Sequence, residues 1–172
     1  DGLTIVLTYE GGELVKAVTR GNGEIGEVIT GNARVFANVP LRISYQGTLI
    51  IRGEAVIKYS DFARINEEIE DVDARYKNPR NLCSGSVRQL NNQITAQRNV
   101  HFEAFMLVRA DGVDFGNSRK RQFQWLESQG FDVVEYQEVD TESLPEAVSV
   151  FAEKIQTYDI PSDGLVLLMD DI

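Results

Sequence analysis

The sequence predicts an α+β fold with mostly antiparallel sheets. The first third of the chain carries two pairs of strand-like segments joined by short turns, and helical patterns are interspersed only after them. No glycine-rich turn links a strand to a helix in the dinucleotide-binding or P-loop pattern, which disfavours a doubly wound parallel sheet. A chain of 172 residues with 42% hydrophobic residues is long enough to bury a core.

A β-hairpin is expected at the start of the chain. Leucine, isoleucine and tyrosine alternate with threonine and valine across 3–9, a turn with two glycines follows at 10–13, and an apolar segment returns at 14–18. Residues 19–27 then form a loop with three glycines, which allow a backbone to take positive φ angles and to approach a ligand closely.

A second pair of strands is expected at 41–44 and 48–59. The tripeptide Arg-Gly-Glu at 52–54 interrupts the longer strand, and a glycine inside an apolar strand indicates the close approach of another group. A helix capped by Ser60 should follow and extend to about Asp71.

The second half of the chain mixes helices and strands. The expected elements are short helices within 74–98, a strand at 100–108, a helix capped by Ser118 and ended by Gly130, a strand at 131–136, a helix at 143–158 and an apolar strand at 164–169.

The segment 74–102 contains no carboxylate, although the net charge of the chain is −10. Its basic residues are Arg75, Lys77, Arg80, Arg88 and Arg98. Arginine presents a planar fork of donors to phosphate oxygens, and Pro79 behind an Asn78 cap can begin a helix whose first amides are free to bind an anion. The segment therefore suits a phosphate-bearing ligand, while charge alone also allows a solvated basic loop.

Composition excludes several classes of protein. No apolar run approaches the roughly 20 residues of a membrane span. Cys83 is the only cysteine, so no internal disulfide can form, as expected for a reducing cytoplasm. A thiol nucleophile at Cys83 has no local support, and no Cys/His cluster has zinc spacing. The acidic charge argues against a domain that holds nucleic acid by itself.

Five motifs, taken in order, resemble the adenylation domain of bacterial NAD-dependent DNA ligases. They are Asp-Gly at 1–2, Thr-Arg-Gly-Asn-Gly at 19–23 with Gly-Glu at 26–27, Arg-Gly-Glu at 52–54, Asn-Pro-Arg-Asn at 78–81 with Gly-Ser-Val-Arg-Gln-Leu at 85–90, and Asp-Gly-Leu-Val at 163–166. The resemblance covers essentially all 172 residues, and the block 78–90 is its most specific part.

This resemblance implies a nucleotidyltransferase-type domain with two antiparallel sheets on either side of an AMP cleft. It implies an enzyme of DNA replication and repair, a cytoplasmic monomer that uses NAD, magnesium and nicked DNA. A lysine attacks the adenylyl phosphate of NAD and releases nicotinamide mononucleotide, and the AMP then passes to the 5′-phosphate of the nick. That lysine is expected two positions before Asp1, outside the given sequence.

Residues 1–172 are thus expected to be the core of the adenylation domain. A helical piece that grips the nicotinamide end is expected upstream. An oligonucleotide-binding fold, a zinc finger, helix-hairpin-helix motifs and a BRCT module are expected downstream.

The resemblance also implies roles for single residues. Arg20 is expected near the ribose of AMP, and Glu54 should accept a hydrogen bond from a ribose hydroxyl. Asp1 and Asp163 are expected close to the phosphate and the metal. Alternatively, Glu54 could form an ion pair with Arg52 inside the strand.

Four further positions are expected to contact the nucleotide. Arg80 and Arg88 should bind phosphates of the cofactor or the nick, and Phe105 should stack on adenine where the family usually has tyrosine. The alternative interpretation, that Phe105 is an ordinary core residue, stays open. Leu168 stands where the family has a lysine that contacts the adenylate, and it cannot supply that charge.

The replacement of the family's lysine by Leu168 motivates an alternative function. The chain would then belong to a degenerate, non-catalytic relative that binds a nucleotide or acts as a scaffold. A residue other than lysine two positions before Asp1 would favour this non-catalytic alternative.

Overall fold

The computed structural model describes residues 3–21, 24–162 and 164–171. Its elements, in chain order, are β1 (Leu3–Glu10), β2 (Glu13–Gly21), β3 (Glu24–Val28), α1 (Thr30–Ala33), β4 (Leu49–Val56), α2 (Tyr59–Glu68), the 3-10 helix η1 (Val72–Ala74), α3 (Pro79–Val87), α4 (Asn92–Gln97), β5 (His101–Ala110), α5 (Arg119–Ser128) and α6 (Leu144–Thr157).

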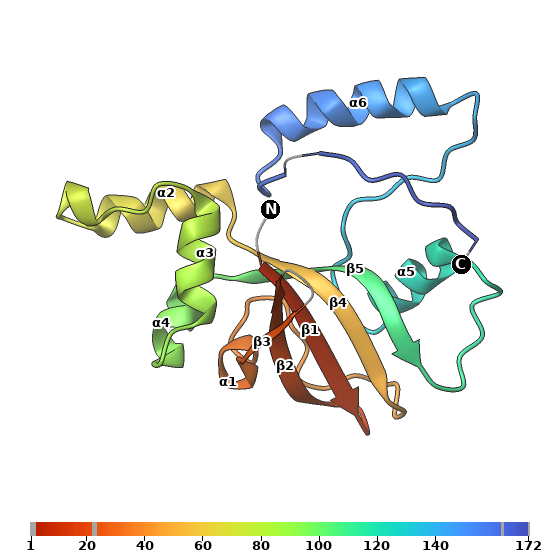
Figure 1. Cartoon of the computed structure of the whole chain (residues 1–172), viewed down its shortest axis with the longest axis horizontal. Coiled ribbons are helices and arrows are strands. Elements are labelled where there is room, and N and C mark those ends of the chain that lie inside the picture. Colours follow the sequence, from red (N-terminus) through yellow and green to blue (C-terminus); the bar gives the residue numbers. More distant parts are fainter. Residues whose placement is uncertain (1–2, 22–23, 163, 172) are drawn as a thin grey trace.

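The strands form one open antiparallel sheet in the order β3-β2-β1-β4-β5 (Figure 1). The central strand β1 pairs with β2 on one side and with β4 on the other. The β1–β2 hairpin turns at Gly11 and Gly12, whose φ angles of 58° and 82° are accessible to glycine. The predicted hairpin and the antiparallel pairing are therefore confirmed.

The described residues do not form the expected second sheet. The apolar segment 131–136 makes one isolated bridge, between Val133 and Ala104 at the edge of β5. Residues 164–169 pair with no strand of the described chain, and Leu165 to Met169 are exposed. A short apolar run favours an extended backbone but does not specify a partner strand, so the sequence overestimated strand content here.

The core lies on one face of the sheet. Alternate residues of β1 and β4, among them Ile5, Leu7 and Ile51, are fully buried there. Leu82 and Val87 of α3 are also fully buried in the same core cluster. The residues between them on each strand are half-buried on the opposite face of the sheet.

Two of the predicted helix caps are confirmed. The Asn78 side chain accepts a hydrogen bond from the Asn81 amide at the start of α3, and the Ser118 side chain accepts one at the start of α5. By contrast, α2 begins at Tyr59, one residue before the expected cap. Within the described ranges, no helix is long and apolar enough to cross a bilayer.

Three helices gather at one end of the sheet. Figure 1 shows α2, α3 and α4 beside the end where β1 starts and β4 ends, while α5 lies beside β5. The thiol of Cys83 in α3 donates to the Ala55 carbonyl of β4 at 3.2 Å, which holds α3 against this end of the sheet.

Gly53 of β4 lies in close contact with β5. A Cβ atom at this position would lie 2.4 Å from the Phe102 ring and 2.5 Å from the Glu103 carbonyl oxygen. The expected close approach at this glycine is confirmed, and the approaching group is the neighbouring strand.

The substitution Gly53→Ala should therefore destabilise the fold. Added volume in a packed core costs about 1–3 kcal/mol because strands or side chains must shift. Urea unfolding followed by circular dichroism measures the change. Gly31→Ala is the matched control, because nothing lies within 4 Å of its added Cβ. Equal stability of the two variants would contradict the close approach at Gly53.

The Cys83 thiol should be unreactive in the folded chain. It is 1% exposed, and burial raises its pKa to about 12. Each pKa unit changes the thiolate fraction tenfold, so alkylation by iodoacetamide at pH 8 should be about a thousandfold slower than in the urea-unfolded chain. Similar rates in the two states, measured by mass spectrometry, would rule out this buried position.

Candidate functional site

A row of polar side chains crosses the half-buried face of the sheet. Thr4 of β1 lies opposite Arg20 of β2 and opposite Glu54 of β4. Residues directly opposite each other on paired strands point to the same face, so Arg20 and Glu54 emerge side by side with Thr4 between them. The Thr4 hydroxyl donates a hydrogen bond of 2.6 Å to a Glu54 carboxylate oxygen.

The local sequence explains this placement. Thr4 and Glu54 alternate with Ile5 and Ala55, which are fully buried in the core. Because side chains of a strand point alternately to its two faces, burial of the apolar neighbours directs the polar ones outward. The structure therefore brings together two of the predicted nucleotide-binding residues, Arg20 and Glu54.

The row continues onto β5 with a second carboxylate. Glu103 lies opposite Glu54 and is only 8% exposed. It makes no hydrogen bond or ion pair with any described residue. Burial, followed by the nearby Asp132 carboxylate, raises the pKa of Glu103 to about 7, and Lys58 opposes this shift.

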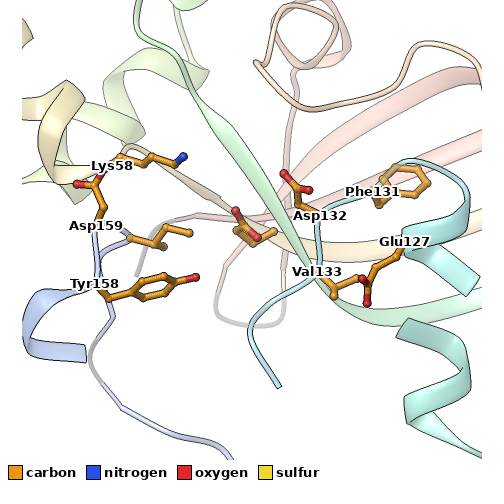
Figure 2. A pocket seen from close by; sticks show the side chains of 9 residues that line it. Lys58, Glu127, Phe131, Asp132, Val133, Tyr158 and Asp159 are labelled. Carbon is orange, nitrogen blue, oxygen red and sulfur yellow. The ribbon is translucent and has the colours of Figure 1, made fainter. Parts of the chain in front are cut away.

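Glu103 lines a cavity of about 400 Å³ at the edge of β5. The other polar residues that line it are Lys58, Glu127, Asp132, Tyr158 and Asp159. In Figure 2, Lys58, Tyr158 and Asp159 lie on one side, and Asp132, Val133 and Glu127 lie on the other. The Lys58 amine and the Tyr158 hydroxyl point into the space between these two sides.

Backbone hydrogen bonds hold both sides of this cavity in place. The Ala104 amide donates to the Asp132 carbonyl at 2.9 Å, which fixes the loop after α5 to β5. The Tyr59 amide donates to the Asp159 carbonyl at 2.8 Å, and the Ser60 hydroxyl donates to the Asp159 carboxylate at 2.6 Å. These contacts fix the segment after α6 to the start of α2.

Arg52 does not pair with Glu54 in the described structure. Its guanidinium carbon lies 5.9 Å from the centre of the Phe105 ring, and one terminal nitrogen lies 3.9 Å from the Met106 sulfur. The buried Arg52 Nε has no hydrogen-bond partner. Phe105 is half-buried, so it is not a fully enclosed core residue.

The two predicted phosphate ligands lie at opposite ends of α3. Arg80 is exposed near the start of this helix, and Arg88 lies just beyond its end. The Arg88 guanidinium contacts a Glu27 carboxylate at 3.4 Å and donates to the Ser84 hydroxyl at 2.6 Å. Between these two arginines, Leu82 and Val87 of α3 are buried in the core cluster.

The remaining predicted positions are Asp1, Asp163 and Leu168. Asp1 and Asp163 lie outside the described residues. Leu168 is described, but it is 58% exposed. The residues after it lie against the start of α5, where the Arg119 amide donates to the Asp170 carbonyl at 2.9 Å.

Glu103 and the cavity residues Lys58 and Tyr158 were not among the residues predicted from the sequence. One signal was present: Glu103 interrupts an otherwise apolar run in β5. An acid in such a run indicates a special environment, because a buried charge without a partner is costly. The cavity itself joins segments that are far apart in the chain, and no local pattern indicates that.

Comparison with known proteins identifies the family. The model of the NAD-dependent DNA ligase adenylation domain matches residues 1–172. The chain is 63% identical over 172 residues to a DNA ligase of Ruminiclostridium cellulolyticum and 64% identical over 172 residues to one of Lachnoclostridium phytofermentans. A DNA ligase of Desulfitobacterium hafniense is 38% identical over 176 residues.

These alignments cover 100% of this chain and 26% to 27% of the relatives. The chain therefore spans about a quarter of the length of the proteins that it matches. It belongs to the family of NAD-dependent DNA ligase adenylation domains.

Proposed function

We propose that the chain binds the adenylate half of NAD on the sheet face that carries Arg20 and Glu54. It would serve as the nucleotide-binding core of an NAD-dependent DNA ligase. The observation that carries this proposal is the row in which Thr4 separates an arginine from a carboxylate. An arginine and a carboxylate side by side match the two polar parts of a nucleotide, which are an anionic phosphate and neutral ribose hydroxyls.

Glu54 would accept a hydrogen bond from a ribose hydroxyl. The Thr4 hydroxyl at 2.6 Å holds one carboxylate oxygen in place, and the two oxygens of a carboxylate together offer about four acceptor positions. A pre-oriented acceptor loses less side-chain entropy on binding than a free one. Arg20, on the other side of Thr4, would provide positive charge near the ribose and its phosphate.

Phe105 would stack on the adenine ring. The Arg52 guanidinium 5.9 Å from the ring centre restrains the ring on one side. A phenylalanine offers the same stacking area as the tyrosine usual in the family and lacks only the hydroxyl. Arg80 and Arg88 would bind phosphates of NAD or of the nick at the end of the sheet.

The chemistry would begin with a lysine upstream of Asp1. Its amine attacks the adenylyl phosphorus, a P–N bond forms, and the P–O bond to nicotinamide mononucleotide breaks. The adenylyl group then passes to the 5′-phosphate of a DNA nick, and the 3′-hydroxyl displaces AMP. Leu168 in place of a lysine would lower the affinity for the adenylate or the rate.

We propose that the enzyme uses magnesium, and we assign no step of the reaction to the ion. Among the described residues, no group of three or more His, Cys, Asp or Glu side chains could hold a metal ion. Asp1 and Asp163, the acids assigned to the metal, are outside those residues.

The whole enzyme would contain much more than this chain. We propose further modules on both sides of it, a nicked-DNA substrate gripped mainly by those modules, a monomeric state and a cytoplasmic location. The non-catalytic alternative is disfavoured, because relatives with 63% and 64% identity carry the name DNA ligase.

The substitution Glu54→Gln in the full-length protein should slow self-adenylation. Loss of a hydrogen bond to a charged group costs about 1.5–3 kcal/mol, which corresponds to a rate about ten- to a hundredfold lower. The measurement is the covalent AMP adduct formed from NAD, followed by mass spectrometry over time. Glu142→Gln, an exposed carboxylate with the same change of charge, should leave the rate unchanged.

Two outcomes would count against the proposal at different levels. An adduct from ATP rather than NAD, or no adduct in the unsubstituted protein, would contradict the proposed function. A normal adduct rate in the Glu54→Gln variant would instead contradict only the role of Glu54.

A further inference from the structure

The acidic side chains that line the cavity beside β5 outnumber the basic ones. Its polar lining has the carboxylates of Glu103, Glu127, Asp132 and Asp159, with Lys58 as the cation among them. Three of these carboxylates accept hydrogen bonds from neighbours: Glu127 from Tyr136, Asp132 from Asn38 and Asp159 from Ser60.

Glu103 is the exception among these carboxylates. It is more than nine-tenths buried, lines the cavity and has no hydrogen bond or ion pair with any described residue. A buried carboxylate without a partner costs free energy, which either a proton or a cation can offset. In the free protein a proton serves this purpose, because the pKa of Glu103 is raised to about 7.

The remaining walls suit an organic cation. The Tyr158 side chain points into the cavity from the segment after α6, and an aromatic ring attracts a cation at its face (Figure 2). Phe131, Val133 and Ile160 supply apolar lining. The volume of about 400 Å³ lies in the range of small-molecule sites.

A bare metal ion is a poor fit to the same cavity. In the described part of the chain, no three carboxylate, histidine or cysteine side chains converge closely enough to hold one. An alkyl chain would fill the apolar part of the cavity, while its charged end would reach Glu103.

We propose that this cavity is a binding site for a small organic cation, an alkylammonium or alkylguanidinium ion, whose charged end pairs with the Glu103 carboxylate. Glu103 lies directly opposite Glu54, so the cavity adjoins the row that holds Arg20 and Glu54, although its lining includes neither of these two residues. Cation binding at this cavity can therefore be measured directly, apart from the formation of the AMP adduct.

The test is calorimetric titration of the full-length protein with n-butylammonium chloride at pH 8. A millimolar dissociation constant is expected, with binding at least tenfold weaker for 1-butanol, which has the same chain without the charge. The Glu103→Gln variant should bind n-butylammonium at least tenfold more weakly. Glu70→Gln, an exposed carboxylate just beyond the end of α2, should bind it as the unsubstituted protein does.

A second variant should improve binding, which a merely damaged fold cannot do. Lys58→Met keeps the apolar stem but removes the one cation that repels the ligand, so affinity should rise several-fold. Lowering the pH from 8 to 6 should weaken binding about tenfold, because protonation of Glu103 removes its charge. The titratable groups that line the cavity beside Glu103 are Lys58, Glu127, Asp132, Tyr158 and Asp159.

The proposal is overturned if n-butylammonium binds no more tightly than 1-butanol. It is equally overturned if Glu103→Gln binds as well as the unsubstituted protein, or if Lys58→Met leaves the affinity unchanged. Loss of binding in Glu103→Gln together with a gain in Lys58→Met supports it, whatever the effect of either variant on ligase activity.

Discussion

The register of the central strand is the constraint on which the site depends. Ile5 and Leu7 of β1 must face the core, and this leaves Thr4 on the opposite face between β2 and β4. A slip of one residue would turn every side chain of β1 to the other face and would place Thr4 in the core. Hydrophobic burial on one side of the sheet thus positions Arg20 and Glu54 on the other, with no direct contact required between them.

Local patterns in the sequence were enough for the elements whose contacts are local. The first hairpin follows from alternation and a glycine turn, and α3 and α5 follow from Asn78 and Ser118, whose side chains cap them. Segments 131–136 and 164–169 were expected to be strands because they are apolar. Strand formation also needs a partner edge, which is a long-range property, and the described structure offers them only one bridge at Val133.

The residues of the candidate site likewise fall into those that the sequence predicted and those that depend on long-range packing. Motif order identified Arg20 and Glu54, and the sheet brings them into one row. The same motifs could not show how α3, which carries Arg80 and ends just before Arg88, packs against the core, because that depends on long-range contacts. Glu103 was missed for a related reason: its unusual environment is made by Asp132 and Tyr158, which come from the segments after α5 and α6.

The two glutamates of the row show how neighbours decide the chemistry of one side-chain type. Glu54 and Glu103 lie opposite each other on β4 and β5, where like charges destabilise a sheet. Glu54 receives a hydrogen bond from Thr4, whereas Glu103 is buried and its pKa rises to about 7. A proton on Glu103 removes the repulsion, and a cation beside it would have the same effect while leaving it ionised. The acid that the sheet cannot pair internally is therefore the one that a ligand can stabilise most, since an already satisfied carboxylate gains little from a new partner.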